Sequence, residues 1–144
     1  GRDAKVSEEK IAPKPQILGP ELAFAWPMKG TLISGFGQKP GGLMNDGINI
    51  QGKVGTPVRS ACEGTVAYAD NKLKGFGHLV IIKHAHGWST AYAHNSKLFV
   101  QKGQKVRKGQ TIALCGEEGN VKSPQLHFEI RYQGRPVDPS PRLK

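Results

Sequence analysis

Short apolar runs separated by turn signals restrict the fold of this chain more than any other feature. The 144 residues include 19 glycines and 10 prolines, and turn-forming residues recur from Lys29-Gly30 to Gln133-Gly134. Glycine adopts backbone angles that other residues avoid, and proline fixes its own φ angle, so both favour turns. Frequent turns predict short strands rather than long helices.

The runs between the turns are rich in β-branched and aromatic residues, which favour strands. The expected strands include Thr31–Ile33, Pro57–Ser60, Thr65–Tyr68, His78–His84, Ser89–Tyr92, Thr111–Leu114 and Leu126–Tyr132. Many short strands with turns between them are typical of antiparallel β-sandwiches and barrel-like sheets. The sequence therefore predicts an all-β fold.

The segment 125–131 alternates between polar and apolar residues, as a strand with one buried face does. Its polar face is expected to hold Gln125, His127, Glu129 and Arg131, and its apolar face Leu126, Phe128 and Ile130. Sheets commonly have one polar face. The polar face of this strand is therefore either a binding surface or only the solvated side of a sheet.

One domain is expected, preceded by a linker. Residues 1–22 are charged, contain three prolines and show neither helical nor strand periodicity, which predicts a flexible, extended segment. Residues 23–144 then form a domain of ordinary size. Because the chain begins with Gly-Arg-Asp rather than methionine, we expect it to be part of a longer protein, with any targeting segment upstream.

The chain carries a net charge of +10, from 21 lysines and arginines against 11 aspartates and glutamates. Such a charge attracts polyanions, an acidic protein or an anionic cell-wall polymer. No helix-turn-helix, zinc-finger or RNP pattern occurs in the sequence, so no nucleic-acid partner is predicted. No run of about 18 apolar residues occurs either, so the domain is not expected to insert into a membrane.

The cysteines and three of the histidines do not predict a chemical site by themselves. Cys62 and Cys115 lie in apolar stretches, and they are either two buried thiols or one disulfide formed in an oxidising compartment. His78, His84 and His86 lie at turns or strand starts without a carboxylate or cysteine nearby in sequence. We interpret these histidines as surface residues rather than metal ligands.

Three motifs, in their order and spacing, carry a resemblance to a known family. They are Asn45-Asp46-Gly47-Ile48-Asn49, Ala91-Tyr92-Ala93-His94 and Gln125-Leu126-His127-Phe128-Glu129. Together with the hairpin-like unit 103–110, whose pattern also occurs in lipoyl-like sandwiches, they make residues 26–139 similar to the LytM or M23 zinc-peptidase family. The resemblance implies an antiparallel β-sandwich with lipoyl-like hairpin elements.

The resemblance also implies where a metal would lie in an active member. There the first motif is similar to His-x-Gly-x-Asp and the last to His-x-His-Phe-Glu, and zinc is bound by the first histidine, the aspartate and the second histidine of the pair. Here these ligand positions hold Asn45, Asn49 and His127, while Gln125 replaces the other histidine of the pair and His94 matches a catalytic position. Neutral amides bind zinc poorly beside imidazole and carboxylate. The resemblance thus implies a catalytically dead domain with no metal and no cofactor.

A binding function is implied in place of catalysis. Metal-less LytM domains of the NlpD, EnvC and DipM kind bind periplasmic N-acetylmuramoyl-L-alanine amidases and activate them for peptidoglycan splitting in cell division. We therefore expect a monomeric periplasmic activator at the division septum, with an amidase as its partner. The alternatives are a peptidoglycan-binding module that recruits other proteins and, less favoured, a zinc endopeptidase with unusual ligands.

The groove that would bind such a partner is expected to hold nine residues: Asn45, Asn49, Trp88, His94, Gln125, His127, Glu129, Arg131 and Tyr132. Arg131 is the first candidate for a carboxylate of the partner. Trp88 and Tyr132 are candidate aromatic anchors, and Trp88 fits a core position equally well. His94, expected at a strand end, is either a hydrogen-bonding group of the groove or a buried histidine with its own partners.

Overall fold

The computed structural model describes residues 22–144. Of the predicted linker, residues 1–22, only Leu22 belongs to the described residues. The strands are β1 (Leu32–Ser34), β2 (Gly37–Gln38), β3 (Met44–Asn45), β4 (Ile48–Gln51), β5 (Pro57–Arg59), β6 (Gly64–Asp70), β7 (His78–Lys83), β8 (Trp88–Leu98), β9 (Lys105–Val106), β10 (Thr111–Cys115), β11 (Gln125–Tyr132) and β12 (Arg135–Val137). Three short 3-10 helices, Pro40–Gly42, Ala85–Gly87 and Ser140–Arg142, complete the described elements.

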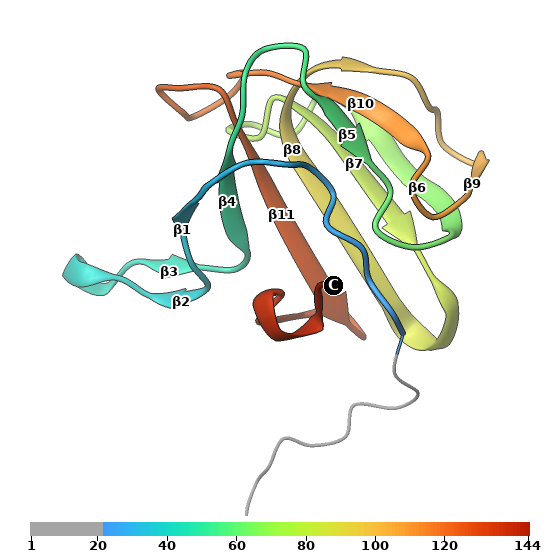
Figure 1. Ribbon diagram of the computed structural model, residues 1–144, viewed down its shortest axis with the longest axis horizontal. Coiled ribbons are helices and arrows are strands. Elements are labelled where there is room, and N and C mark those ends of the chain that lie inside the picture. Colours follow the sequence, from blue (N-terminus) through green and yellow to red (C-terminus); the bar gives the residue numbers. More distant parts are fainter. Residues whose placement is uncertain (1–21) are drawn as a thin grey trace, which may run out of the picture.

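Ten of these strands form one sheet, in which the order β1-β4-β11-β8-β7-β6-β9 forms the main path (Figure 1). β12 pairs with β11, and β10 pairs with both β8 and β5. Every pairing between named strands is antiparallel. The hairpin of β2 and β3 is separate and projects beside β1 and β4. The predicted all-β, antiparallel fold is therefore confirmed.

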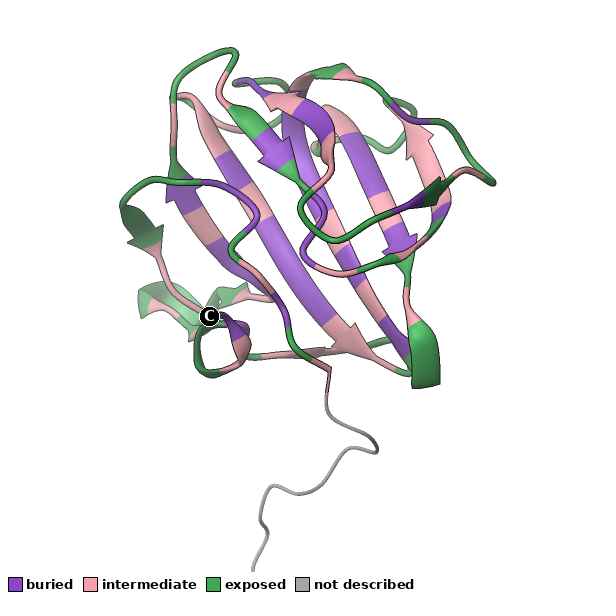
Figure 2. Cartoon of the chain, turned by 45° about the vertical axis from the view of Figure 1, so that its right-hand side comes forward, coloured by how far each residue is buried: buried purple, intermediate pink, exposed green. Residues whose placement is uncertain are grey.

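The long strand β8 connects the two layers of the fold. Its first part, up to Ala93, pairs with β11, whereas Asn95 to Leu98 pair with β10. Between the two parts His94 has a φ of 74°, a left-handed angle that non-glycine residues rarely adopt. A local break of this kind lets one strand pass from one layer to another. The β5–β10 pair thus lies over the main sheet, with the core between the layers (Figure 2).

The core is apolar and comes from both layers. The largest fully buried side chains are Trp88, Tyr92, Phe24, Phe128, Ile48, Ile50, Ile82, Ile112, Leu126, Ile130, Val58 and Val66. On β11 the predicted alternation is confirmed, since Leu126, Phe128 and Ile130 have no exposed surface. The polar residues of that strand consequently face the other side, where the candidate site lies.

A close backbone approach fixes the connection between β3 and β4. A Cβ atom added at Gly47 would lie 2.2 Å from the carbonyl oxygen of Phe128 on β11. No side chain fits at that distance, so only glycine lets this connection pass over β11. The approach brings Asn45 and Asn49, on either side of Gly47, against the polar face of β11.

Candidate functional site

A groove lies over the polar face of β4, β8 and β11. Its volume is about 630 Å³, and it is lined by Ser34, Lys39, Leu43, Met44, Asn45, Asn49, Lys74, Gly75, Phe76, His94, Asn120 and His127. Four of the nine residues predicted for the groove are in this lining: Asn45, Asn49, His94 and His127. The resemblance motifs, far apart in sequence, therefore meet at one place.

A row of three side-chain amides begins at the groove floor, where Asn45 and Asn49 line the groove, and ends at Gln125 outside the lining. The Asn45 amide donates to the Ser34 hydroxyl (2.9 Å) and to Asn49 Oδ1 (3.1 Å). The Asn49 amide donates in turn to Gln125 Oε1 (2.8 Å). Along the row, each amide nitrogen therefore donates to the next acceptor.

Main-chain groups fix that direction at both ends of the row. At one end the Gly47 N–H donates to Asn45 Oδ1 (3.1 Å), so this atom must be an acceptor. At the other end the Gln125 amide donates to the Ser123 carbonyl (3.3 Å), so that atom must be a donor. Flipping one amide would place two donors or two acceptors against each other, with loss of hydrogen bonds. The floor has one consistent arrangement.

His127 connects the amide row to a pair of charged residues. Its Nδ1 lies 3.2 Å from Asn49 Oδ1, and its Nε2 lies 2.8 Å from Glu129 Oε2. The second Glu129 oxygen accepts a hydrogen bond from Arg131 Nε (2.7 Å). Burial raises the pKa of Glu129, but the hydrogen bonds from His127 and Arg131 outweigh burial, so the net pKa lies below the ordinary value. Glu129 is therefore held as a carboxylate.

His94 faces His127 across the groove, with the two ring centroids 6.3 Å apart. Only 6% of His94 is exposed, and its Nδ1 donates to the Glu118 carbonyl (2.8 Å). Burial lowers the pKa of His94, the Glu118 bond opposes this effect, and the charge of His127 adds to it. The two alternatives for His94 are thus both correct in part, because it is a buried, hydrogen-bonded histidine that still lines the groove. It lies inside β8, not at a strand end as predicted.

The donor set of the groove does not fit zinc. A catalytic zinc site needs three protein ligands of imidazole, carboxylate or thiolate type, and residues 22–144 contain no group of three or more histidines, cysteines, aspartates or glutamates that could hold a metal. At the positions implied by the resemblance, the amides of Asn45 and Asn49 already make hydrogen bonds to each other and to their neighbours. Hydrogen-bonded amides therefore occupy positions where an active member would have zinc ligands.

Arg131, predicted to meet a carboxylate of a partner, already has contacts within its own chain. The guanidinium bonds Glu129 and the Gly134 carbonyl (3.0 Å), and Asp46 lies 3.8 Å away. Two of its five N–H donors thus make hydrogen bonds within the chain, and a third of the side chain stays exposed. Arg131 holds Glu129 in place beside His127, and its contact with a partner carboxylate stays a prediction.

The predicted aromatic anchors lie outside the groove. Trp88 is 1% exposed and packs against Phe24 and Tyr132, with ring centroids 5.7 and 4.9 Å apart. Trp88 and Tyr132 pair at the end of β8 and β11 that is remote from His127. Their alternation along the strands turns both rings toward the core. The core alternative for Trp88 is correct, and the groove role of both residues is wrong.

Of the three turn histidines, only His86 is fully exposed as predicted. His84 is half-buried, where its Nδ1 donates to the Glu63 carbonyl (2.6 Å) and its Nε2 accepts from the Thr90 hydroxyl (2.8 Å). Burial lowers the pKa of His84, with the Glu63 bond opposing it. His78 is half-buried too and bonds the Asn95 carbonyl (3.2 Å). The two histidines support strand ends from within the fold.

Both cysteines are free thiols, Cys62 half-buried and Cys115 buried. Burial raises the pKa of Cys115 to about 11 and also raises that of Cys62. Such thiols are protonated at neutral pH. The alternative of two thiols is the one that the structure contains.

The rim of the groove carries exposed apolar side chains that the sequence analysis missed. Leu43 is 70% exposed, Met44 50% and Phe76 39%, and all three line the groove. Large exposed apolar groups gathered in one place are typical of interaction sites. Met44 stands next to Asn45 in the first motif, which is the one sequence signal that could have located this rim.

Comparisons with known proteins agree with this geometry. The model of Peptidase family M23 matches residues 43–139. The chain is 49% identical over 81% of its length to Cell division protein DipM of Caulobacter vibrioides and 49% identical over 87% to the Lipoprotein NlpD/LppB homolog of Pseudomonas aeruginosa. It is 44% identical over 83% to Murein hydrolase activator NlpD of Escherichia coli. It spans 20%, 41% and 31% of the lengths of these relatives, less than half of each.

Solved structures show the same fold. A zinc-containing peptidase from Vibrio cholerae has a TM-score of 0.74 at 34% identity, covering 82% of this chain and 39% of that one. The catalytic domain of lysostaphin from Staphylococcus simulans has a TM-score of 0.73 at 28% identity, covering 78% of this chain and 90% of the other. The backbone of this chain is thus similar to that of peptidases, whereas its groove floor is made of amides.

Proposed function

The chain belongs to Peptidase family M23, and from that premise we propose that it is a non-catalytic member that binds a cell-wall amidase in its groove and activates it. The observation that carries the proposal is the amide row at the metal position. Asn45, Asn49 and Gln125 supply neutral groups that bond one another. Neutral amides hold zinc poorly, so the floor supports binding rather than hydrolysis.

The groove has the composition of a binding surface. Its floor is held rigid by hydrogen bonds, and its rim offers Leu43, Met44 and Phe76. A partner segment with apolar side chains would cover this rim, and burying apolar surface contributes about 25 cal/mol per Å² before the costs of association. The names of two relatives, a murein hydrolase activator and a cell division protein, support an activator rather than a mere binder.

Activation requires that the domain bind one form of the amidase better than another. If an amidase exchanges between a blocked and an open form, a ligand shifts that exchange only through its difference in affinity for the two. Raising the open form from 1% to 99% needs a difference of about 10⁴-fold. The domain therefore acts by preferring the open amidase, and no chemistry of its own is needed.

A place in the cell envelope follows from the same proposal. Relatives are named as lipoproteins and as a cell division protein, which supports the periplasm and the division septum as the site of action. No helix among residues 22–144 is long and apolar enough to cross a membrane. We take the monomer as the binding unit.

The test is release of dye from labelled peptidoglycan by three samples: the chain alone, a periplasmic amidase alone, and the two together. We expect release above the amidase level only in the mixture. The variant Leu43→Ser/Phe76→Ser should lower activation about tenfold or more, since it removes apolar contacts at the rim. Val54→Ser/Phe99→Ser removes similarly exposed apolar groups outside the groove (59% and 47% exposed) and should leave activation unchanged.

Three outcomes would overturn the proposal or a part of it. Release by the chain alone, abolished by a chelator, would make it a metal-dependent hydrolase. If the chain neither binds the amidase nor raises its activity, the activator role is wrong. Equal loss in the rim variant and its matched control would move the partner site away from the groove.

A further inference from the structure

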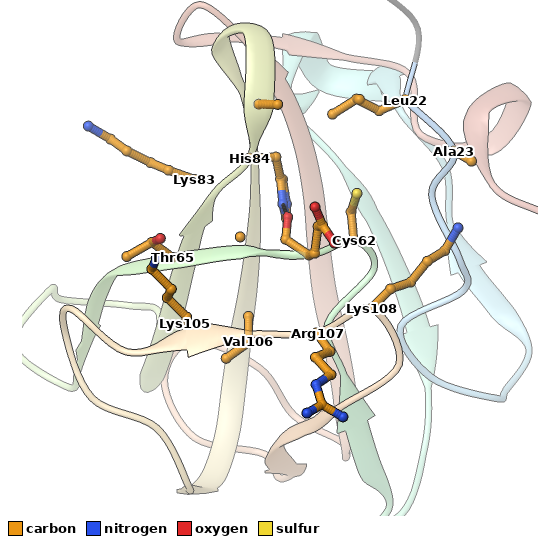
Figure 3. A pocket seen from close by; sticks show the side chains of 13 residues that line it. Leu22, Ala23, Cys62, Thr65, Lys83, His84, Lys105, Val106, Arg107 and Lys108 are labelled. Atoms are coloured by element: carbon orange, nitrogen blue, oxygen red, sulfur yellow. Dashed lines mark hydrogen bonds between the residues drawn. The ribbon is translucent and has the colours of Figure 1, made fainter.

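A second pocket, rich in cationic residues, lies at the end of the sheet remote from the groove. Its volume is about 860 Å³, and its lining comes from the start of β6, the end of β7, the β9 region and Leu22 with Ala23. Four cations belong to this lining, Lys83, Lys105, Arg107 and Lys108 (Figure 3). We call it the basic pocket.

Strand pairing places two of these cations in one row. Thr65 on β6 pairs with Lys83 of β7 on one side and with Lys105 of β9 on the other. Residues directly opposite on neighbouring strands point to the same face. With strands about 4.8 Å apart, the backbones of the two lysines are separated by about 10 Å. Two exposed lysines thus lie on either side of the exposed Thr65 in the sheet.

The cations of the basic pocket have no carboxylate of their own. Within residues 22–144, none of the four forms an ion pair. The lining contains a single acidic residue, Glu63, which leaves an excess of three positive charges, four cations against one anion. A local excess of positive charge of this kind attracts an anionic ligand.

The backbone around the basic pocket is firmly held. In the turn that carries Arg107 and Lys108, the Arg107 N–H donates to Gln110 Oε1 (2.9 Å). The Gly109 N–H donates to the Ser60 carbonyl (2.8 Å), and the Ser60 N–H donates to Gln110 (2.9 Å). The backbone that carries Arg107 and Lys108 is therefore set before any ligand arrives, and only their exposed side chains have to become ordered on binding.

The basic pocket and the groove can be occupied together. β7 begins at His78, which pairs with Asn95 beside the groove, and ends at Lys83. A strand rises about 3.3 Å per residue, so these ends are about 16 Å apart. A ligand in the basic pocket would not cover His94 or His127.

We propose that the basic pocket binds free carboxylates of peptidoglycan stem peptides. The proposal rests on the proposed function, which places the chain at peptidoglycan, a polymer whose stem peptides end in carboxylates. Lysine and arginine bind carboxylates through charge-assisted hydrogen bonds. Besides the cations, the pocket offers the apolar side chains of Leu22 and Val106 to the alkyl groups of a peptide. The domain thereby holds the polymer at one end and, at the other end, the amidase that cleaves the polymer.

The test is co-sedimentation of the full chain with purified Gram-negative sacculi, without amidase. The variant Lys83→Gln/Lys105→Gln should raise the apparent Kd about fivefold or more at low salt, because it removes both ends of the lysine row. The matched control Lys29→Gln/Lys53→Gln lowers the net charge equally at exposed lysines outside the basic pocket. Its Kd should stay within about twofold of the unchanged chain.

Chemistry of the sacculi identifies the ligand. Sacculi whose carboxylates have been converted to amides should bind several-fold more weakly. Unchanged binding to amidated sacculi would overturn the carboxylate assignment. Equally weakened binding by both lysine variants would show that the net positive charge of the whole chain, rather than the basic pocket, attracts the sacculi. Circular dichroism and thermal unfolding confirm that each variant is folded.

A separate readout keeps this proposal apart from the proposed function. Binding of the amidase to the chain in solution, without sacculi, depends on the groove, and the basic-pocket variant should retain it. Retained amidase binding with lost sedimentation supports the basic pocket. The unchanged chain could also sediment with sacculi but fail to bind the amidase. That outcome would support the basic pocket and contradict the activator role.

Discussion

At the scale of single residues, Asn49 holds the groove floor together. Its oxygen lies within hydrogen-bond distance of both Asn45 and His127, and its amide donates to Gln125. We expect Asn49→Ala to lower the free energy of unfolding by about 1–3 kcal/mol, since it leaves half-buried polar groups without partners. Urea unfolding measures the change. Asn71→Ala, at an exposed position, should change stability by less than about 0.5 kcal/mol, and an equally small loss at Asn49 would mean that the row is not cooperative.

Acid should destabilise the fold in two stages. Burial lowers the pKa of His84 and His94 below 6.5, so the unfolded chain takes up these protons first and stability falls as the pH drops below 6.5. Glu129 has a net pKa below 4.5. Its contribution is complete above pH 4.5 and is lost as the pH falls through the lowered value. Urea midpoints between pH 8 and about 3 should show both declines.

The variant His94→Asn isolates one part of the first stage. Asparagine tolerates the positive φ of position 94 better than most residues, and its amide can replace Nδ1 as donor to the Glu118 carbonyl. It does not titrate, so the decline below pH 6.5 should be shallower than in the unchanged chain. An identical pH profile would show that His94 binds its proton equally in the folded and unfolded chain, against the lowered pKa.

Residue roles were predictable only where alternation or a motif fixed them. The polar face of β11 followed from the period of two in residues 125–131, and the gathering of Asn45, Asn49, His94 and His127 followed from the resemblance. Trp88 failed as a groove contact because its packing against Phe24 and Tyr132 depends on tertiary contacts that no local pattern encodes. The apolar rim was missed for the same reason.

At the scale of elements, the β3–β4 connection depends on Gly47. Gly47→Ala would bring a Cβ within 2.2 Å of the Phe128 carbonyl, which must push β4 away from β11. We expect a loss of about 3 kcal/mol or more in the free energy of unfolding. Gly35→Ala is the control, because its nearest neighbour lies 3.8 Å away. A Gly47 variant as stable as this control would show that the connection moves freely.

The strands around the groove should also accept a restored metal site. The triple variant Asn45→His/Asn49→Asp/Gln125→His places imidazole and carboxylate beside His127, in the family pattern. We expect about one zinc per chain after dialysis, against far less than one in the unchanged chain. Metal analysis by mass spectrometry gives the ratio. A triple variant without zinc would mean that β3, β4 and β11 have moved apart since the ligands were lost.

Element boundaries were predicted well for most strands and poorly for one. Runs such as 57–60 and 78–84 match β5 and β7 within one residue. The range Ser89–Tyr92 covers only the first half of β8, which extends to Leu98. Residues 88–102 contain neither glycine nor proline, and this long uninterrupted stretch was the available signal. The break at His94 could not be foreseen, since it reflects the change of pairing partner from β11 to β10.

At the scale of the whole molecule, a chain that binds sacculi through the basic pocket and an amidase through the groove should link the two. In a mixture of chain, amidase and sacculi, we expect more amidase in the pellet than sacculi alone retain. Lys83→Gln/Lys105→Gln should abolish this increase by weakening the contact with the polymer. Leu43→Ser/Phe76→Ser should abolish it by weakening the contact with the amidase. An increase that survives either variant would show that the two sites are not linked through this domain.

The fold class was predictable from the whole sequence, whereas the topology was not. Turn spacing and strand-forming runs are sufficient for an all-β prediction, because they depend on local backbone preferences. The order β1-β4-β11-β8-β7-β6-β9 depends on which strands bury each other's apolar faces. The placement of β4 beside β11 joins residues that no local preference links.

The pairing of β4 with β11 also sets the order in which the groove can form. Asn49 and His127 are 78 residues apart, and closing so long a loop is slow because its entropy must be lost before any contact compensates. A chain emerging from a ribosome or a translocation channel therefore displays strands β5 to β8 and their hairpins well before it has a groove. Until residues 125–128 are free to join the sheet, the groove is incomplete, and the site proposed for a partner is incomplete with it.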